Sequence, residues 1–257
     1  MEITKDDRFS AWLLAEIYKS FTEGREDRSG TWHVSDLMFP RYAVLQKLEG
    51  TVIPTAQDVG FFFTGEAYHR MLQKVMGEHD SEKRVEAYGI LGSIDFFDGD
   101  LLIEIKTSRQ WTVPEEPKEH YIEQVGYYAA ITGKKTVRII LILPTAGRKW
   151  DGSESSTVEL RTWTVVFTDE ELATIAAHMI ELKTSMEAAL VSFDLTTLPM
   201  CPEWKYGSLR QDPETKKWEV KARCPFAHIC RCQEEKLQAE ADLKNSRVGS
   251  RGGKRGF

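Results

Sequence analysis

Long hydrophobic runs are missing from this chain of 257 residues. The longest strongly apolar stretch after Arg138 is Ile139–Leu143, far below the roughly 20 residues that a membrane-spanning helix requires. The first residues, MEITKDDRFSAW, contain no apolar stretch of the kind that forms a secretory signal. We therefore expect no membrane association and a cytoplasmic location.

An excess of positive charge is missing too. The chain has 34 Lys and Arg against 40 Asp and Glu, a net charge of −6, which excludes a histone-like protein that coats DNA. The basic residues are unevenly spread, because residues 244–257 hold five of them and no acid, which leaves −11 for the rest. The glycines near the end of this segment predict a flexible basic tail.

Cysteine is scarce, and all four cysteines fall within residues 201–232. In a large chain with no export signal, this clustering favours metal ligation over disulfides. Four thiolates in a proline-rich stretch can hold an iron–sulfur cluster or Zn²⁺, and buried structural thiols are the remaining alternative. The four candidate ligands are Cys201, Cys224, Cys230 and Cys232.

A nucleotide-binding loop is absent from the sequence. The nearest match, TGKKT at residues 132–136, lacks the leading glycine and the spacing of the G-x-x-x-x-G-K-[ST] motif. We therefore expect no ATP-driven motor activity from this chain.

What the sequence does contain is an alternation of helix and strand patterns in a composition that is 41% hydrophobic and 29% charged, typical of a globular α/β protein. Helices are predicted over residues 8–22, 36–48 (capped by Ser35), 60–76, 118–132 and 168–190. Strands are predicted over residues 84–91, 90–97, 101–106, 136–143 and 157–167. The predicted regions are 1–60 (N-terminal helices), 61–192 (core), 193–243 (cysteine-rich lobe) and 244–257 (tail).

One predicted hairpin, GSIDFFDGDLLIEIKTS at residues 92–108, carries charged residues on one face. A turn at Gly99–Asp100 places Asp95 opposite Glu104, and a turn at Asp98–Gly99 makes the two carboxylates diagonal neighbours. In either register they share a face with Lys106. A Mg²⁺ or Mn²⁺ ion between the carboxylates would remove their repulsion; the alternative is an ordinary solvated face.

Three segments, in the same order, resemble the motifs of the RecB-like branch of the PD-(D/E)XK nuclease superfamily. They are Gly65–His69 (GxxxH), Asp95 with Glu104–Lys106 (D…ExK) and Gln124–Tyr128 (QxxxY). The resemblance implies a restriction-endonuclease-like core, in which a mixed central sheet is flanked by helices, with N-terminal helices and a cysteine-rich C-terminal lobe.

The resemblance also implies a role for each motif residue. The implied ligands of Mg²⁺ or Mn²⁺ are His69, Asp95, Glu104 and the backbone carbonyl of Ile105. Lys106 would be the catalytic lysine, and Gln124 and Tyr128 would position it and the DNA backbone.

The iron–sulfur exonucleases of this branch usually bind a [4Fe–4S] cluster through one N-terminal cysteine and three near the C-terminus. This chain has Phe39-Pro40-Arg41 where the first cysteine is expected, and Lys221 where another is expected. The resemblance therefore implies that Cys201 and Cys232 replace them beside Cys224 and Cys230, with Zn²⁺ as the alternative.

The function that the resemblance implies is exonucleolytic hydrolysis of single-stranded DNA or DNA ends, together with partner proteins of recombination, repair, phage replication or CRISPR adaptation. The alternative is a DNA-binding accessory protein with a vestigial nuclease site and a metal-stabilised cysteine lobe. Candidate phosphate contacts are Arg41, Arg70, Lys74, Arg109, Lys205, Arg210 and the tail, and candidate stacking residues are Trp111, Trp204 and Tyr206.

Overall fold

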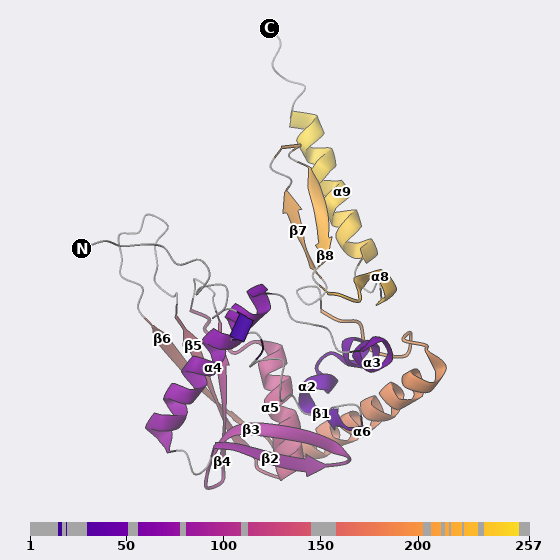
Figure 1. Cartoon of the computed structure of the whole chain (residues 1–257). Coiled ribbons are helices and arrows are strands. Elements are labelled where there is room, and N and C mark those ends of the chain that lie inside the picture. Colours follow the sequence, from indigo (N-terminus) through magenta and orange to yellow (C-terminus); the bar gives the residue numbers. More distant parts are fainter. Residues whose placement is uncertain are drawn as a thin grey trace, which may run out of the picture. The chain divides into compact units, whose positions relative to one another are not determined.

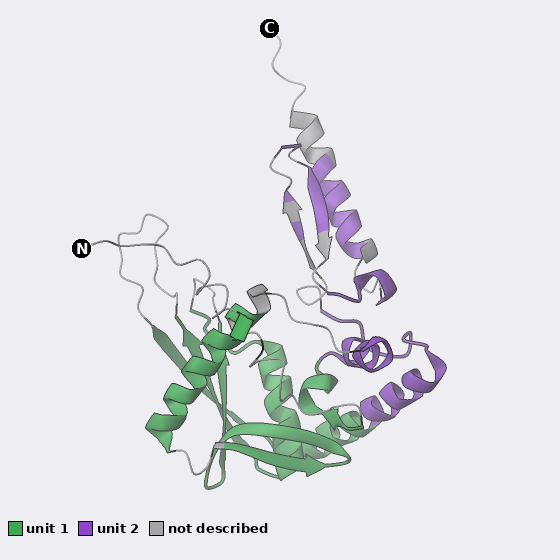
Figure 2. Cartoon of the chain, viewed as in Figure 1, with its two compact units in different colours: residues 1–38, 53–180 green, residues 39–52, 181–257 purple. Residues whose placement is uncertain are grey.

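The chain forms two compact units in its computed structural model (Figure 1). The structure describes residues 15–16, 19, 30–50, 56–77, 81–108, 113–144, 158–202, 207–211, 214–215, 217–222, 224–230 and 234–251. One unit comprises residues 1–38 and 53–180, and the second comprises residues 39–52 and 181–257 (Figure 2). The predicted region of residues 1–60 is therefore divided between the two units. Most of the helix predicted over residues 8–22 lies outside the described residues.

A mixed β-sheet forms the centre of the first unit, as predicted (Figure 1). Its strands run in the order β1-β3-β4-β5-β6, and β2 pairs with β3. The β1/β3 and β4/β5 pairs are parallel, whereas β2/β3, β3/β4 and β5/β6 are antiparallel. The strands are β1 Trp32–His33, β2 Ser81–Ala87, β3 Ile90–Asp98, β4 Leu101–Thr107, β5 Thr136–Leu143 and β6 Glu159–Val166.

Helices cover both faces of this sheet. Tyr68 and Leu72 of α4 (Ala56–Met76) pack on an apolar cluster that includes Ile103 and Ile105 of β4. On the opposite face, α5 (Glu119–Thr132) contacts β2 and β5. Because both faces are covered, β5 is buried at nearly every position, which explains its continuous apolar sequence.

The helix predicted over residues 36–48 is in fact two helices, α2 (Val34–Leu37) and α3 (Pro40–Glu49). Pro40 has no N–H to donate to a preceding turn, so it begins a new helix at its first position instead of continuing the earlier one. The predicted cap at Ser35 is also wrong, because the backbone N–H of His33 donates to the Asp36 carboxylate at 2.8 Å and His33 is the cap residue.

Two predicted helix ends are confirmed. Gly133 ends α5 in the left-handed conformation, with a φ of 68°, as glycine does at many helix ends. A capping box begins α6 (Asp169–Ser192): the Glu171 N–H donates to Thr168 Oγ1 at 3.2 Å, and the Thr168 N–H donates to Glu171 Oε2 at 2.8 Å. No helix in the described residues is long and apolar enough to cross a membrane.

The second unit contains secondary structure that the sequence pattern did not indicate. Beyond α6, the strands β7 (Gly207–Gln211) and β8 (Trp218–Ala222) pair as an antiparallel hairpin, followed by α8 (Ala227–Cys230) and α9 (Glu234–Arg251). The core of this unit also uses α3, and its buried members are Leu45, Cys224, Phe226, Ala227 and Leu237.

Helix α9 includes residues 244–251, so this part of the predicted flexible tail is helical, whereas residues 252–257 lie outside the described residues. Lys244 pairs with Glu240 at 2.7 Å and lies 4.6 Å from the centre of the Trp218 ring. Asn245 accepts a hydrogen bond from the Trp218 N–H at 2.7 Å and donates one to its carbonyl at 3.0 Å. These polar contacts add to the apolar packing of Leu237 and Ala241, which lie four residues apart on α9 and are both buried.

Replacing Gly60 by alanine is expected to stabilise the protein by about 0.5–1 kcal/mol. Gly60 is exposed within α4, and a methyl group there would meet no atom within 4 Å. Alanine therefore restricts the unfolded chain without disturbing the fold. Urea unfolding of the two proteins measures the difference, and a lower midpoint for Gly60→Ala would contradict the expectation.

Candidate functional site

The β3–β4 hairpin brings the two predicted carboxylates together. Its register pairs are Asp98 with Leu101, Phe97 with Leu102 and Phe96 with Ile103, so the turn lies at Gly99–Asp100. Of the two registers considered above, the one that places Asp95 opposite Glu104 is therefore confirmed. Asp95 Oδ2 accepts a hydrogen bond of 2.7 Å from the Ile105 N–H, which ties this carboxylate to β4.

The two oxygens of the buried Glu104 carboxylate have different surroundings. The residue is 4% exposed, and its Oε1 accepts hydrogen bonds from Lys106 Nζ at 2.5 Å and Gln124 Nε2 at 3.3 Å. Within the described part of the chain, no donor reaches the buried Oε2. Burial raises the pKa of Glu104 to about 7, although the charge of Lys106 acts in the opposite direction.

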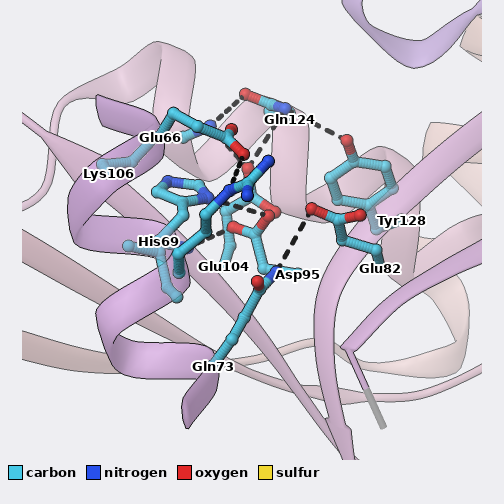
Figure 3. Close-up of polar contacts among 11 residues, drawn as sticks. Glu66, His69, Gln73, Glu82, Asp95, Glu104, Lys106, Gln124 and Tyr128 are labelled. Atoms are coloured by element: carbon cyan, nitrogen blue, oxygen red, sulfur yellow. Dashed lines mark hydrogen bonds and ion pairs between the residues drawn. The ribbon is translucent and has the colours of Figure 1, made fainter. Parts of the chain in front are cut away.

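Helix α5 fixes the position of the lysine. Lys106 Nζ donates to Gln124 Oε1 at 2.8 Å, and Gln124 Nε2 donates to the Tyr128 hydroxyl at 3.2 Å (Figure 3). Gln124 and Tyr128 are four residues apart and share one face of the helix. The structure thus places both residues of the QxxxY segment against the D…ExK segment.

Another predicted site residue, His69, reaches the site from α4. Its Nδ1 lies 3.5 Å from Asp95 Oδ1. Burial disfavours protonation of this imidazole, but the hydrogen bond and charge of Asp95, together with Glu104, outweigh it and raise the pKa of His69. Among the described residues, Lys106 and, when it is protonated, His69 therefore oppose the negative charge of the two carboxylates.

Two further polar residues that the sequence reasoning did not identify, Gln73 and Glu82, lie near these side chains (Figure 3). Gln73 Nε2 donates to Glu82 Oε1 at 3.2 Å, which links α4 to β2. Glu82 is on β2, between Ser81, which pairs with Phe96, and Lys83, which pairs with Ile94, so it lies beside Asp95 of β3. Its φ is 50°. Only the spacing of Gln73, one turn beyond His69, could have pointed to these contacts.

The structure gives two of the predicted DNA-contacting arginines other partners. Arg70 Nε donates to Glu66 at 2.7 Å, and Arg41 donates twice to the Leu198 carbonyl, at 2.9 and 2.8 Å. Arg41 therefore holds the backbone of the second unit together. The candidates Arg109, Trp111, Lys205, Trp204 and Tyr206, and the side chain of Arg210, lie outside the described residues.

The donor set of the first unit fits a hard divalent cation. Two carboxylates, an imidazole and the Ile105 carbonyl are oxygen-rich ligands suited to Mg²⁺ or Mn²⁺, and the unpaired Glu104 Oε2 supplies a buried acceptor without a donor in the described residues. Among those residues, no three His, Cys, Asp or Glu side chains stand in position to hold an ion.

The cysteines do not form a metal-binding group in the part of the chain that is described. Cys201 and Cys224 are buried and Cys230 is half-buried. Cys224 and Cys230 contact the apolar core of the second unit around Leu45, whereas Cys232 lies outside the described residues. A cluster on these cysteines stays a prediction.

In the absence of metal, Glu104→Gln is expected to become increasingly more stable than the wild type as pH rises from about 4.5 to about 7. An unfolded Glu104 loses its proton near its ordinary pKa of 4.5, whereas the folded protein retains it up to about 7. The folded wild type therefore loses stability across this window. The substituted glutamine does not titrate, and it removes a charge that raises the pKa of His69, which changes the stability difference in the same direction. Urea unfolding in EDTA across the window tests this, and a constant difference would contradict it.

The comparisons with known proteins return solved structures only. No family model and no curated protein matches the chain. The protein SSO0001 is 19% identical, with a TM-score of 0.49 over 86% of this chain and 95% of that one. An alkaline exonuclease (LHK-Exo) from Laribacter hongkongensis is 19% identical, with a TM-score of 0.45 over 70% of this chain and 95% of that one. A phage-related exonuclease from Haemophilus somnus 129PT is 14% identical, with a TM-score of 0.36 over 73% of this chain and 85% of that one. Likenesses at this level assign no activity to this chain.

Proposed function

We propose that this chain is a metal-dependent deoxyribonuclease of the PD-(D/E)XK type, which hydrolyses phosphodiester bonds. The observation that carries the proposal is the buried Glu104, whose Oε2 has no donor in the described residues while Lys106 and Asp95 stand beside it. An unpaired buried carboxylate oxygen destabilises a fold by about 1–3 kcal/mol. Groups of this kind are characteristic of functional sites.

The proposed ligands of Mg²⁺ or Mn²⁺ are His69, Asp95, Glu104 and the Ile105 carbonyl. When bound, such an ion supplies a Lewis acid for the phosphoryl oxygen and lowers the pKa of a water molecule. The hydrogen bond from Ile105 holds the Asp95 carboxylate at 2.7 Å, so this ligand is fixed before the ion arrives.

The remaining residues supply charge and orientation. Lys106 carries its positive charge next to Glu104, where it would orient the attacking water and stabilise negative charge on the phosphoryl oxygens. The Gln124 side chain accepts one hydrogen bond from Lys106 Nζ, so the ammonium group has a partner besides Glu104 that would keep it in place. Tyr128 holds Gln124 in turn.

The proposed mode of action is exonucleolytic, on single-stranded DNA or DNA ends. The proposed enzyme is cytoplasmic and acts with partner proteins. The ordered GxxxH, D…ExK and QxxxY segments support this choice, because their resemblance is to the RecB-like branch. The same resemblance is the reason to propose a [4Fe–4S] cluster, with Zn²⁺ as the alternative, on Cys201, Cys224, Cys230 and Cys232.

Incubation with end-labelled single- and double-stranded DNA tests the function. With Mn²⁺ or Mg²⁺ we expect progressive shortening from an end, and with EDTA we expect intact DNA. The label position gives the polarity. DNA that is bound but never cut under any of these conditions would contradict the proposal and favour an accessory protein with a vestigial site.

Anaerobic purification tests the cysteine ligands separately. A brown protein that absorbs near 400 nm and contains iron would support the cluster. A colourless protein with stoichiometric zinc would contradict the cluster and support the Zn²⁺ alternative. A protein with neither metal would indicate that the cysteines are buried structural thiols.

A further inference from the structure

Gly92 of β3 lies against the aromatic ring of Tyr128. A methyl group at Gly92 would lie 2.8 Å from Cε1 and 3.1 Å from Cδ1 of that ring, and 3.2 Å from Cγ2 of Val85. Contacts under 3.0 Å force a movement of one partner. The φ of Gly92 is outside the left-handed region, so the backbone conformation would accept any residue. Glycine is required here because the ring occupies the space of a side chain.

The Tyr128 ring has little freedom to move away. It is 6% exposed, and its hydroxyl accepts a hydrogen bond of 3.2 Å from Gln124 Nε2. The other end of the same amide, Gln124 Oε1, accepts the 2.8 Å hydrogen bond from Lys106 Nζ. Gly92, Tyr128, Gln124 and Lys106 therefore form one continuous series of contacts, whose last three members appear in Figure 3.

We propose that Gly92 is a positioning residue for the active site. Its missing side chain seats Tyr128 at the distance at which the hydroxyl fixes Gln124, and Gln124 in turn fixes Lys106. The inference rests on the proposed nuclease function. Gly92 itself would touch neither DNA nor metal.

The test is a set of four proteins: wild type, Gly92→Ala, Tyr128→Phe and the double variant. A shift of about 1 Å in a catalytic group lowers rates by roughly 100-fold, so we expect kcat of Gly92→Ala to fall about 10- to 100-fold at saturating DNA and Mn²⁺. Tyr128→Phe keeps the ring but removes the hydroxyl. The double variant should therefore have a lower melting temperature than Tyr128→Phe, as Gly92→Ala has relative to the wild type. Its kcat should equal that of Tyr128→Phe.

Two results would overturn the proposal: an undiminished kcat for Gly92→Ala, or an equal loss of kcat from Gly92→Ala in both backgrounds. Failure of the nuclease proposal is distinguishable, because the wild type would then cut no DNA. The thermal unfolding measurements need no activity. If Gly92→Ala is destabilising in the wild type and neutral in Tyr128→Ala, the packing is as described, whatever the activity.

Gly126→Ala provides a matched control on the helix that carries Tyr128. Its methyl group would lie 3.2 Å from Cδ1 of Ile175, at the end of a flexible side chain, and near Phe167. We expect kcat within about twofold of the wild type, since the contact is apolar and involves none of the four linked residues. Gly92→Ala itself could fail to fold. In that case the double variant Gly92→Ala with Tyr128→Ala is expected to fold, because the ring that the methyl group meets is then absent. If Tyr128→Ala folds and this double variant does not, the contact between Gly92 and the ring is refuted.

Discussion

Replacing Lys106 by alanine is expected to lower the rate of DNA cleavage by at least about 1,000-fold while the protein remains folded. Lys106 Nζ lies 2.5 Å from the Glu104 carboxylate. Its loss removes the charge that would stabilise the phosphoryl oxygens. The side chain is 18% exposed, so water can fill the vacated space and the fold should be retained.

Cleavage of end-labelled DNA with Mn²⁺, together with circular dichroism of both proteins, measures this effect. Lys134→Ala is the matched control, because Lys134 pairs with Asp100, whose side chain is 94% exposed, at the tip of the hairpin. It should cut DNA at the wild-type rate. A Lys106→Ala protein that retains more than about one tenth of the activity would show that this lysine is not catalytic.

The second large effect is expected at Asp95, where two substitutions separate charge from structure. Asp95→Asn keeps an oxygen that can accept the Ile105 N–H, so its stability should stay close to that of the wild type. The negative charge is lost, and with it the proposed metal ligand. We therefore expect cleavage to fall at least about 100-fold at a fixed Mn²⁺ concentration, with part of the activity returning at high Mn²⁺.

Asp95→Ala should be equally inactive and also less stable, by about 1–3 kcal/mol, because the Ile105 N–H then loses its acceptor. Denaturant unfolding in EDTA and cleavage across a Mn²⁺ titration measure the two effects independently. Equal stability of the two variants would show that the hydrogen bond contributes nothing. Wild-type cleavage by Asp95→Asn would remove Asp95 from the proposed ligands.

Local patterns predicted most of the first unit correctly. The bounds of β5, the end of α5 at Gly133 and the capping box at Thr168 follow from residues that are neighbours in the sequence. The break between α2 and α3 was missed, although Pro40 supplied the reason for it. Helix α9 was missed because its buried apolar stripe is short, with Leu237 and Ala241 four residues apart, and because the contact of Asn245 with β8 joins segments that no sequence spacing relates.

In the candidate site, too, contacts between sequence neighbours could be predicted, whereas contacts between distant segments could not. Asp95, Glu104 and Lys106 could be placed together because one tight turn fixes their register. The contact between Gln73 and Glu82 joins a helix to a strand that follows it, and no alternation or helical spacing relates the two. Gly92 is a still harder case, since a glycine in a strand does not reveal which ring takes the place of its side chain.

The second unit has a consequence for the order in which the chain folds during synthesis. Its core joins Leu45 of α3 to Phe226 and Leu237, residues that leave the ribosome much later. At 5–20 residues per second the delay is on the order of 10–40 s. During that interval α3 is exposed without its apolar partners, while the first unit can already be complete.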